Sequence, residues 1–152
     1  SYDFKGKLNY FIARDMFPNS KFKYKNPPMS KDTVCFELFI NWNEPIVLCE
    51  GVFDAIAIRN NAIPLLGKFP SRTLLSELAY QQPKRIYVAL DTDAKKDALK
   101  LVKSLMDSGI ETYLLEMMDK DPSELGFKRF WKIVEQSNPF KFSDVIKGRL
   151  YA

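Results

Sequence analysis

The chain has 152 residues, 46% of them hydrophobic and 28% charged, which fits one globular domain able to bury a core. Its formal net charge of +4 is too mild by itself to indicate a nucleic-acid-binding protein. No apolar run approaches the roughly 20 residues that span a bilayer, and no signal-peptide core is present, so we expect a cytoplasmic protein. The absence of histidine excludes a Cys-His nucleophile and argues against a zinc cluster, so Cys35 and Cys49 are expected to be buried thiols.

The first 44 residues combine basic and aromatic side chains. Between positions 5 and 31, seven Lys or Arg residues stand against a single acid, Asp15. Residues 7–14 and 21–24 are predicted as strands, and the prolines that follow Asn26 predict an extended loop. Residues 33–42 are ambiguous, and we expect a short helix there. A basic flank of this kind suits a polyanionic ligand.

From residue 45 onward, short apolar runs alternate with helical patterns, which is typical of β-α-β units around a parallel sheet. The predicted strands are residues 45–49, 63–66, 85–90 and 110–116, and the predicted helices are residues 52–60, 72–81 and 94–107. A polar loop at 118–124 leads to a last helix with an apolar stripe over residues 127–134. We predict an α/β fold with a central, mainly parallel sheet flanked by helices, divided into residues 1–44, 45–125 and 126–152.

Carboxylates follow two of these strands directly. Glu50 comes after the first strand, and Asp91 and Asp93 come after the third. The carboxyl ends of parallel strands meet at one edge of a sheet, where ligands bind, so the three acids should converge. Their mutual repulsion requires a cation or raised pKa values, and carboxylate oxygens without Cys or His favour Mg²⁺ or Mn²⁺. Alternatively, Asp93 only caps the next helix, and Glu50 is only a solvated strand end.

Gly51 and Asp54 extend this pattern into the first predicted helix. A glycine at a helix start lets backbone approach an anion such as phosphate, although it also suits a plain tight turn. Asp54 lies one helical turn after Glu50 and can face the same edge as a further metal ligand. An acid in the first turn also complements the helix dipole, so both interpretations of Asp54 stay open.

The two motifs together, Glu-Gly-x-x-Asp and Asp-x-Asp some forty residues apart, resemble the Toprim domain of bacterial-type primases, topoisomerases and some nucleases. The resemblance covers roughly residues 45–124. It implies that Glu50 is the general acid or base, and that Asp91 and Asp93 hold divalent metal.

Two further stretches resemble primases among the Toprim enzymes. Lys120-Asp121-Pro122 is similar to a primase element whose first aspartate, here Asp121, adds to the acidic site; Ser123 stands where the family has a second aspartate. Upstream, Arg14 and the run from Lys23 to Pro27 resemble a basic primase segment, which implies that Arg14, Lys23 and Asn26 contact template or nucleotide phosphates. As isolated residues, these three would be ordinary solvated surface.

The resemblance therefore implies the catalytic core of a DNA primase, of bacterial or bacteriophage type, in which residues 1–44 end the N-terminal lobe. Such an enzyme uses Mg²⁺ or Mn²⁺ to make RNA primers from NTPs on a single-stranded DNA template. A zinc-binding module and a replicative helicase are the expected partners, in the same chain or in separate ones. The alternatives are a Toprim nuclease, and a non-catalytic nucleic-acid-binding module.

Overall fold

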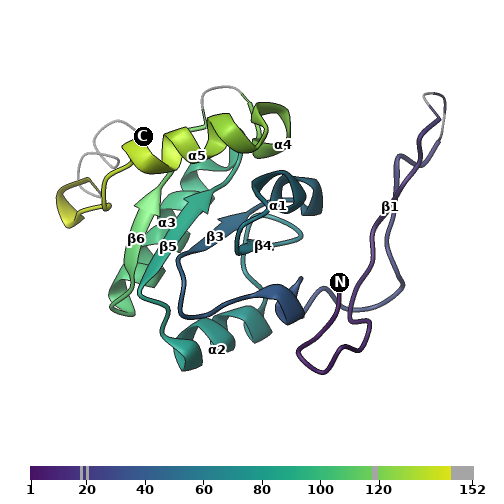
Figure 1. Ribbon diagram of the computed structural model, residues 1–152, viewed down its shortest axis with the longest axis horizontal. Coiled ribbons are helices and arrows are strands. Elements are labelled where there is room, and N and C mark those ends of the chain that lie inside the picture. The colour runs from purple at the N-terminus through teal and green to yellow at the C-terminus, as the bar shows by residue number, and fades with distance from the viewer. Residues whose placement is uncertain (18, 20, 118–119, 145–152) are drawn as a thin grey trace.

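A four-stranded parallel sheet forms the centre of the protein in the computed structural model, which describes residues 1–17, 19, 21–117 and 120–144 (Figure 1). The end of the predicted C-terminal segment, residues 145–152, and the start of the predicted loop at 118–124 lie outside these residues. The strand order is β4-β3-β5-β6. The strands are β3 (Ile46–Cys49), β4 (Ala62–Pro64), β5 (Arg85–Ala89) and β6 (Glu111–Leu114). This arrangement confirms the predicted α/β class.

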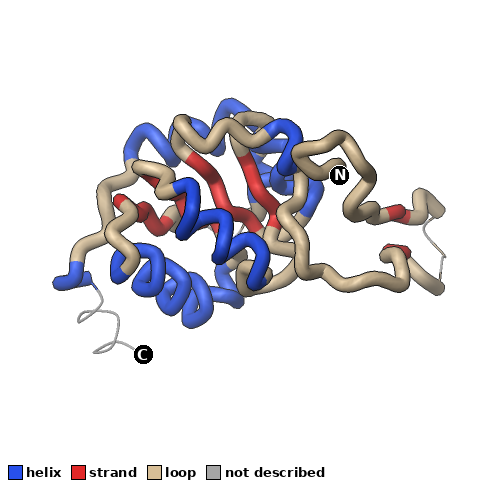
Figure 2. Tube along the Cα trace, turned by 90° about the horizontal axis from the view of Figure 1, so that it is seen from below, coloured by secondary structure: helices blue, strands red, loops and turns tan. Residues whose placement is uncertain are grey.

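Helices cover both faces of the sheet (Figure 2). Side chains alternate between the faces along each strand, so Ile46 and Leu48 pack on one side while Val47 and Cys49 pack on the other. The first face packs against α2 (Arg72–Gln81) and α3 (Lys95–Asp107). The second face packs against α1 (Val52–Ile58) and α5 (Phe127–Gln136). Both cysteines are buried free thiols, as expected.

The predicted elements from residue 45 onward are all present, with ends shifted by a few residues. The prediction of α2 agrees with the structure at both ends, and α3 is preceded by a 3-10 turn, η2 (Thr92–Ala94). A short helix that the sequence reading missed, α4 (Pro122–Leu125), begins inside the predicted polar loop. None of the helices among the described residues is long and apolar enough to cross a membrane.

The predictions for the first 44 residues are partly wrong: the loop after Asn26 is present, but the two strands are much shorter than predicted. Among the described residues of this segment, the only strands are β1 (Ala13–Arg14) and β2 (Tyr24–Lys25), and Leu8 makes one isolated bridge with Tyr2, so residues 7–12 and 21–23 are not strands. A strand forms only where a neighbouring strand can pair with it. Residues 7–12 instead lie beside the extended segment at Val34, whose carbonyl accepts a hydrogen bond from the Asn9 side chain. The hairpin formed by β1 and β2 projects beside the sheet (Figure 1).

The helix predicted at residues 33–42 is also wrong, because only a 3-10 turn, η1 (Glu37–Phe39), forms there. Phe36 before it has a left-handed backbone with φ of 62°, which ends regular helix geometry. Val34 and Cys35 are buried, so core packing of the extended segment outweighs its helical tendency.

A substitution at Phe130 tests whether α5 belongs to the core. Its side chain is fully buried among residues of the sheet and α1, so Phe130→Ala should lower the free energy of unfolding by about 3–5 kcal/mol. Urea denaturation measures this loss. Tyr80→Ala is the control, because that aromatic ring is 82% exposed and should cost under about 0.5 kcal/mol. Equal losses in the two variants would contradict the assigned core.

Candidate active site

The register of the sheet brings the predicted acidic residues together. Cys49 of β3 pairs with Ala89 of β5, so both strands end at the same level of the sheet. Glu50 follows β3 at once, and Asp91 follows β5 after one further residue. Asp91 then starts the turn η2 with an extended backbone, which carries Asp93 round toward Glu50.

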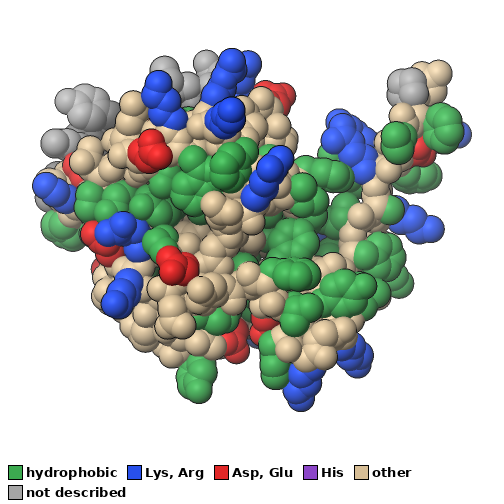
Figure 3. Space-filling view, viewed as in Figure 1, with side chains coloured by type: hydrophobic (Ala, Val, Ile, Leu, Met, Phe, Trp, Pro, Cys, Tyr) green, Lys and Arg blue, Asp and Glu red, His purple; other side chains and the backbone are tan. Residues whose placement is uncertain are grey.

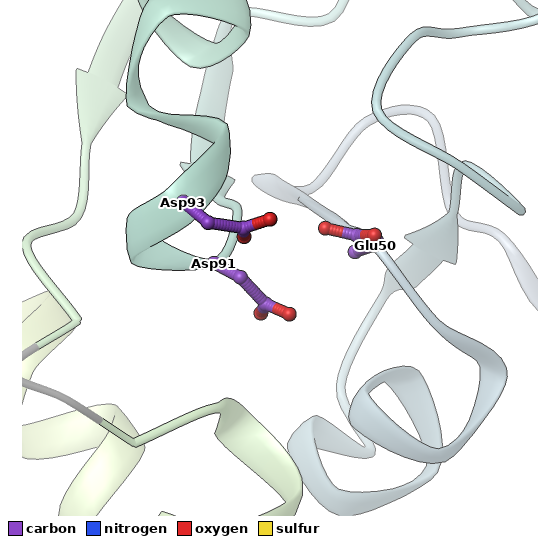
Figure 4. A group of neighbouring side chains, drawn as sticks. All are labelled: Glu50, Asp91 and Asp93. Atoms are coloured by element: carbon purple, nitrogen blue, oxygen red, sulfur yellow. The ribbon is translucent and has the colours of Figure 1, made fainter.

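Glu50, Asp91 and Asp93 form one carboxylate cluster, in which one ligand oxygen from each residue lies within 4.8 Å of the others (Figure 4). Glu50 and Asp91 are half-buried, whereas Asp93 is exposed. Glu50 Oε2 and Asp91 Oδ1 are buried and have no hydrogen-bond partner among the described residues. Because buried polar atoms are normally paired, these two oxygens indicate a missing cationic or hydrogen-bonding partner.

The electrostatics of the carboxylate cluster are uneven. Burial raises the pKa of Glu50 and of Asp91, and the nearby carboxylates raise both further. Asp93 behaves differently: its Oδ2 lies 2.8 Å from the Lys68 ammonium, whose hydrogen bond and charge lower the pKa of this carboxyl. Asp93 therefore pairs with Lys68, and the predicted alternative that it caps the next helix is not observed, because α3 has no side-chain cap.

Sequence reasoning missed Lys68, although a signal was present. The residue follows β4, which is parallel to β3 and ends at the same edge. Residues that follow parallel strands meet at one edge of the sheet. Lys68 follows the predicted strand at 63–66, just as the acids follow the strands at 45–49 and 85–90, so the same reasoning places Lys68 beside the acids.

The carboxylate cluster suits a divalent cation. All three donors are hard oxygens, which favour Mg²⁺ or Mn²⁺. The two unpartnered buried oxygens are the atoms that such an ion would satisfy.

Asp54 lies next to the cluster but is engaged elsewhere. Its Oδ2 accepts the Gly51 N–H at 3.0 Å and its Oδ1 accepts the Ser123 N–H at 3.2 Å, so it joins the start of α1 to α4. Burial, followed by repulsion from Asp121, raises its pKa despite these hydrogen bonds. Its predicted role as a metal ligand stays a prediction.

Gly51 is required by space more than by backbone freedom. Its φ of −113° is open to any residue, but a Cβ atom would lie 2.9 Å from Asp54 Oδ2. The Asp54 carboxylate therefore packs closely against this glycine, and it also accepts a hydrogen bond from the Gly51 N–H. The predicted phosphate contact stays a prediction.

Asp121 caps α4 and lies beside both Asp54 and Asp91, whose pKa values it raises. Its Oδ1 accepts the Glu124 N–H at 2.8 Å and the Ser123 hydroxyl at 2.7 Å. Ser123, which stands where the similar primase element has a second aspartate, therefore links two neighbouring carboxylates by hydrogen bonds.

A groove of about 670 Å³ separates the acidic edge from the basic hairpin. Arg14, Lys23 and Asn26 line one side, and Glu50 lines the other. Figure 3 shows basic and hydrophobic side chains together along the projecting hairpin. The three predicted basic and amide side chains therefore share a groove with Glu50, Asp54 and Asp121, whereas Asp91 and Asp93 line a separate pocket that also includes Asp121.

Comparison with known proteins adds a fold assignment. No protein-family model matches the chain, and no curated protein sequence does. Among solved structures, the primase of Aquifex aeolicus, covering its zinc-binding and RNA polymerase domains, superposes with a TM-score of 0.72 at 21% identity. The RNA polymerase domain of the Mycobacterium tuberculosis primase gives 0.71 at 19% identity. The primase fragment of the bacteriophage T7 primase-helicase gives 0.67 at 18% identity.

These matches cover 91%, 91% and 88% of this chain. The chain shares the fold of part of a primase RNA polymerase domain. The fold agrees with the Toprim resemblance seen in the sequence. The chain spans 39%, 54% and 60% of those three structures, so it corresponds to part of each. At these identities the likeness shows the shared fold.

The raised pKa values predict how stability depends on pH without metal. Glu50, Asp54 and Asp91 hold protons to higher pH when folded than at their ordinary values of 4.5, 3.8 and 3.8. The folded state therefore binds more protons above about pH 4, and stability falls as pH rises through the folded pKa values. Asp91→Asn should flatten this fall and make the metal-free protein more stable than the wild type near neutral pH.

Urea denaturation in a chelator, between about pH 5 and pH 7, measures this effect. The exposed Asp107, paired with Lys103 on α3, provides the control variant Asp107→Asn, which should keep the wild-type slope. An excess of Mg²⁺ should reverse the order of the Asp91→Asn and wild-type proteins. An equal dependence of stability on pH in the wild type and in Asp91→Asn would refute the interpretation.

Proposed function

We propose that this chain is the catalytic core of a DNA primase, which joins NTPs into short RNA primers on single-stranded DNA with the help of a divalent cation. The observation that carries the proposal is a single groove lined by acidic side chains on one side and by basic side chains on the other. Glu50, whose Oε2 has no partner among the described residues, lines the groove at the strand end together with Asp54 and Asp121. Arg14, Lys23 and Asn26 line the same groove from the hairpin. Phosphate groups fit between a cation held by acids and a basic surface.

The acidic side supplies the metal site. Glu50, Asp91 and Asp93 would hold Mg²⁺ or Mn²⁺, with Asp54 and Asp121 as further acids beside them. The bound cation would neutralise negative charge on the attacking and leaving oxygens of nucleotidyl transfer. Glu50 is also the proposed general acid or base, because burial and neighbouring carboxylates raise its pKa above the ordinary value, which makes the group better able to hold and release a proton.

The basic side binds the polyanions. Arg14 and Lys23 would neutralise phosphates of the template or of the NTP, and Asn26 would add a neutral hydrogen bond. Gly51 lies on the acidic side of the same groove, where its backbone would approach the nucleotide.

Two partners follow from this role. The similar Aquifex structure includes a zinc-binding domain, and the T7 fragment comes from a primase-helicase, so we propose that a zinc-binding module and a replicative helicase work with this chain. The short loops of the Toprim segment and the T7 similarity favour a bacteriophage-type enzyme acting in the host cytoplasm.

Glu50→Gln tests the catalytic assignment. The change preserves the shape of the side chain and removes its charge, so primer synthesis should fall by roughly 10²–10⁴-fold while the fold survives. The assay measures labelled RNA products with the zinc-binding module present. Glu44→Gln is the matched control, since Glu44 is exposed and precedes the same strand at its opposite end. Near-normal synthesis by Glu50→Gln would show that Glu50 is structural.

Changing Arg14 and Lys23 together to Ala tests the basic side. The loss of two phosphate contacts should flatten the log–log salt dependence of single-stranded DNA binding by roughly 1.4, at about 0.7 per contact. Fluorescence anisotropy across a salt series measures the slope. A double change of the exposed Lys128 and Lys132 on α5 serves as the control. An unchanged slope would remove these residues from the interface.

One further assay separates primase from nuclease, because both chemistries use the same carboxylates. The protein is incubated with labelled single-stranded DNA, Mn²⁺ and NTPs. RNA products support the proposal, whereas shortened DNA that forms without NTPs would identify a Toprim nuclease.

A further inference from the structure

Lys68 lies in the connection between β4 and α2, and its Nζ lies 2.8 Å from Asp93 Oδ2. This connection is fixed at several points. The Leu65 N–H donates to the Cys49 carbonyl at 2.8 Å, and the Lys31 ammonium donates to the Leu66 carbonyl at 3.1 Å. At its far end, Ser71 caps α2 by accepting the Leu74 N–H. The ammonium is therefore carried to the carboxylate cluster by an anchored segment.

The charge of Lys68 reaches more than one carboxylate. Besides pairing with Asp93, it lowers the pKa of Glu50 and of Asp91, against the larger raising effect of their burial. In the cluster, one positive charge thus stands beside three negative ones. Glu50 Oε2 and Asp91 Oδ1 have no partner among the described residues, so Lys68 compensates the cluster in part.

We propose that Lys68 is an internal counter-cation, which stabilises the metal-free carboxylate cluster and competes with the divalent cation for Asp93. The proposal rests on the metal site of the proposed function and adds a residue that sets its affinity. A lysine ammonium and a divalent ion repel each other, and they share one carboxylate here. The protein therefore gives up part of its affinity for the ion in return for a stable fold without it.

An ordinary surface ion pair is the simpler explanation. The two side chains are 38% and 72% exposed, and exposed pairs usually contribute little to stability. The two explanations predict different effects of Lys68 on metal binding. A surface pair stabilises the protein equally with and without metal, whereas a counter-cation stabilises the metal-free form and weakens metal binding.

Lys68→Met separates them, because methionine removes the charge and keeps an unbranched side chain. Calorimetric titration with MnCl₂ should show about three- to tenfold tighter binding than in the wild type at low ionic strength. The midpoint of thermal unfolding should fall by about 1–3 °C in a chelator and recover fully with saturating Mn²⁺. Neither readout requires catalytic activity.

Three further variants define the cause. Lys68→Arg keeps the charge and should retain wild-type Mn²⁺ affinity. Lys103→Met removes another paired lysine, 2.6 Å from Asp107 on α3, and should leave Mn²⁺ affinity unchanged. In an Asp93→Asn background, the effect of Lys68→Met on Mn²⁺ affinity should fall by at least half, because the shared carboxylate is gone.

The outcomes separate this proposal from the proposed function. A wild-type protein that takes up no Mn²⁺ overturns the metal site and with it the proposal. Mn²⁺ binding by the wild type, with equal or weaker binding by Lys68→Met, overturns the role of Lys68 alone. If the Lys68→Met protein does not fold, the Lys68→Gln variant is measured in its place and judged by the same criteria.

Discussion

The parallel pairing of β3 with β5 is the constraint on which the candidate active site depends. Because Cys49 pairs with Ala89, the acids that follow the two strands must meet at one edge. Both strands are almost wholly buried between two helical layers, so they cannot shift apart without opening the core. The core thus holds like charges together that would separate in solution, and burial of the sheet offsets the repulsion among them.

Different neighbours resolve this repulsion for different acids. Asp93 has the Lys68 ammonium, and Asp54 has the amide groups of Gly51 and Ser123. Glu50 and Asp91 each keep a buried oxygen without a partner among the described residues. Asp93 and Asp54 thus have compensating partners, whereas Glu50 and Asp91 at the centre each keep an unpaired oxygen, which is the pattern expected where a ligand supplies the missing charge. Stability is given up at the atoms that the proposed metal site would use.

The sequence could predict whatever depends on strongly buried strands. Runs such as Ile46 to Cys49 are apolar on both faces, which predicts a parallel sheet, and the sheet in turn predicts where Glu50 and Asp91 meet. The reading was wrong where tertiary contacts decide. Residues 7–12 form no strand beyond a single bridge from Leu8 to Tyr2, and Phe36 adopts a left-handed backbone inside a predicted helix. The local pattern of each segment carries no sign of either fact.

The placement of the basic hairpin depends on an aromatic stack more than on its strands. Two residue pairs join β1 to β2, extended by one hydrogen bond from the Asp15 N–H to the Lys23 carbonyl, which is a short ladder for a projecting hairpin. The Arg14 guanidinium, however, lies 5.6 Å from the ring of Tyr24 and 5.5 Å from that of Phe53 in α1. Tyr24 and Phe53 are themselves 6.3 Å apart. Since α1 starts directly after Glu50 and Gly51, this stack joins the basic side of the groove to the acidic side. Arg14 therefore helps to set the width of the groove it lines, and substitutions at Phe53 would act on both walls.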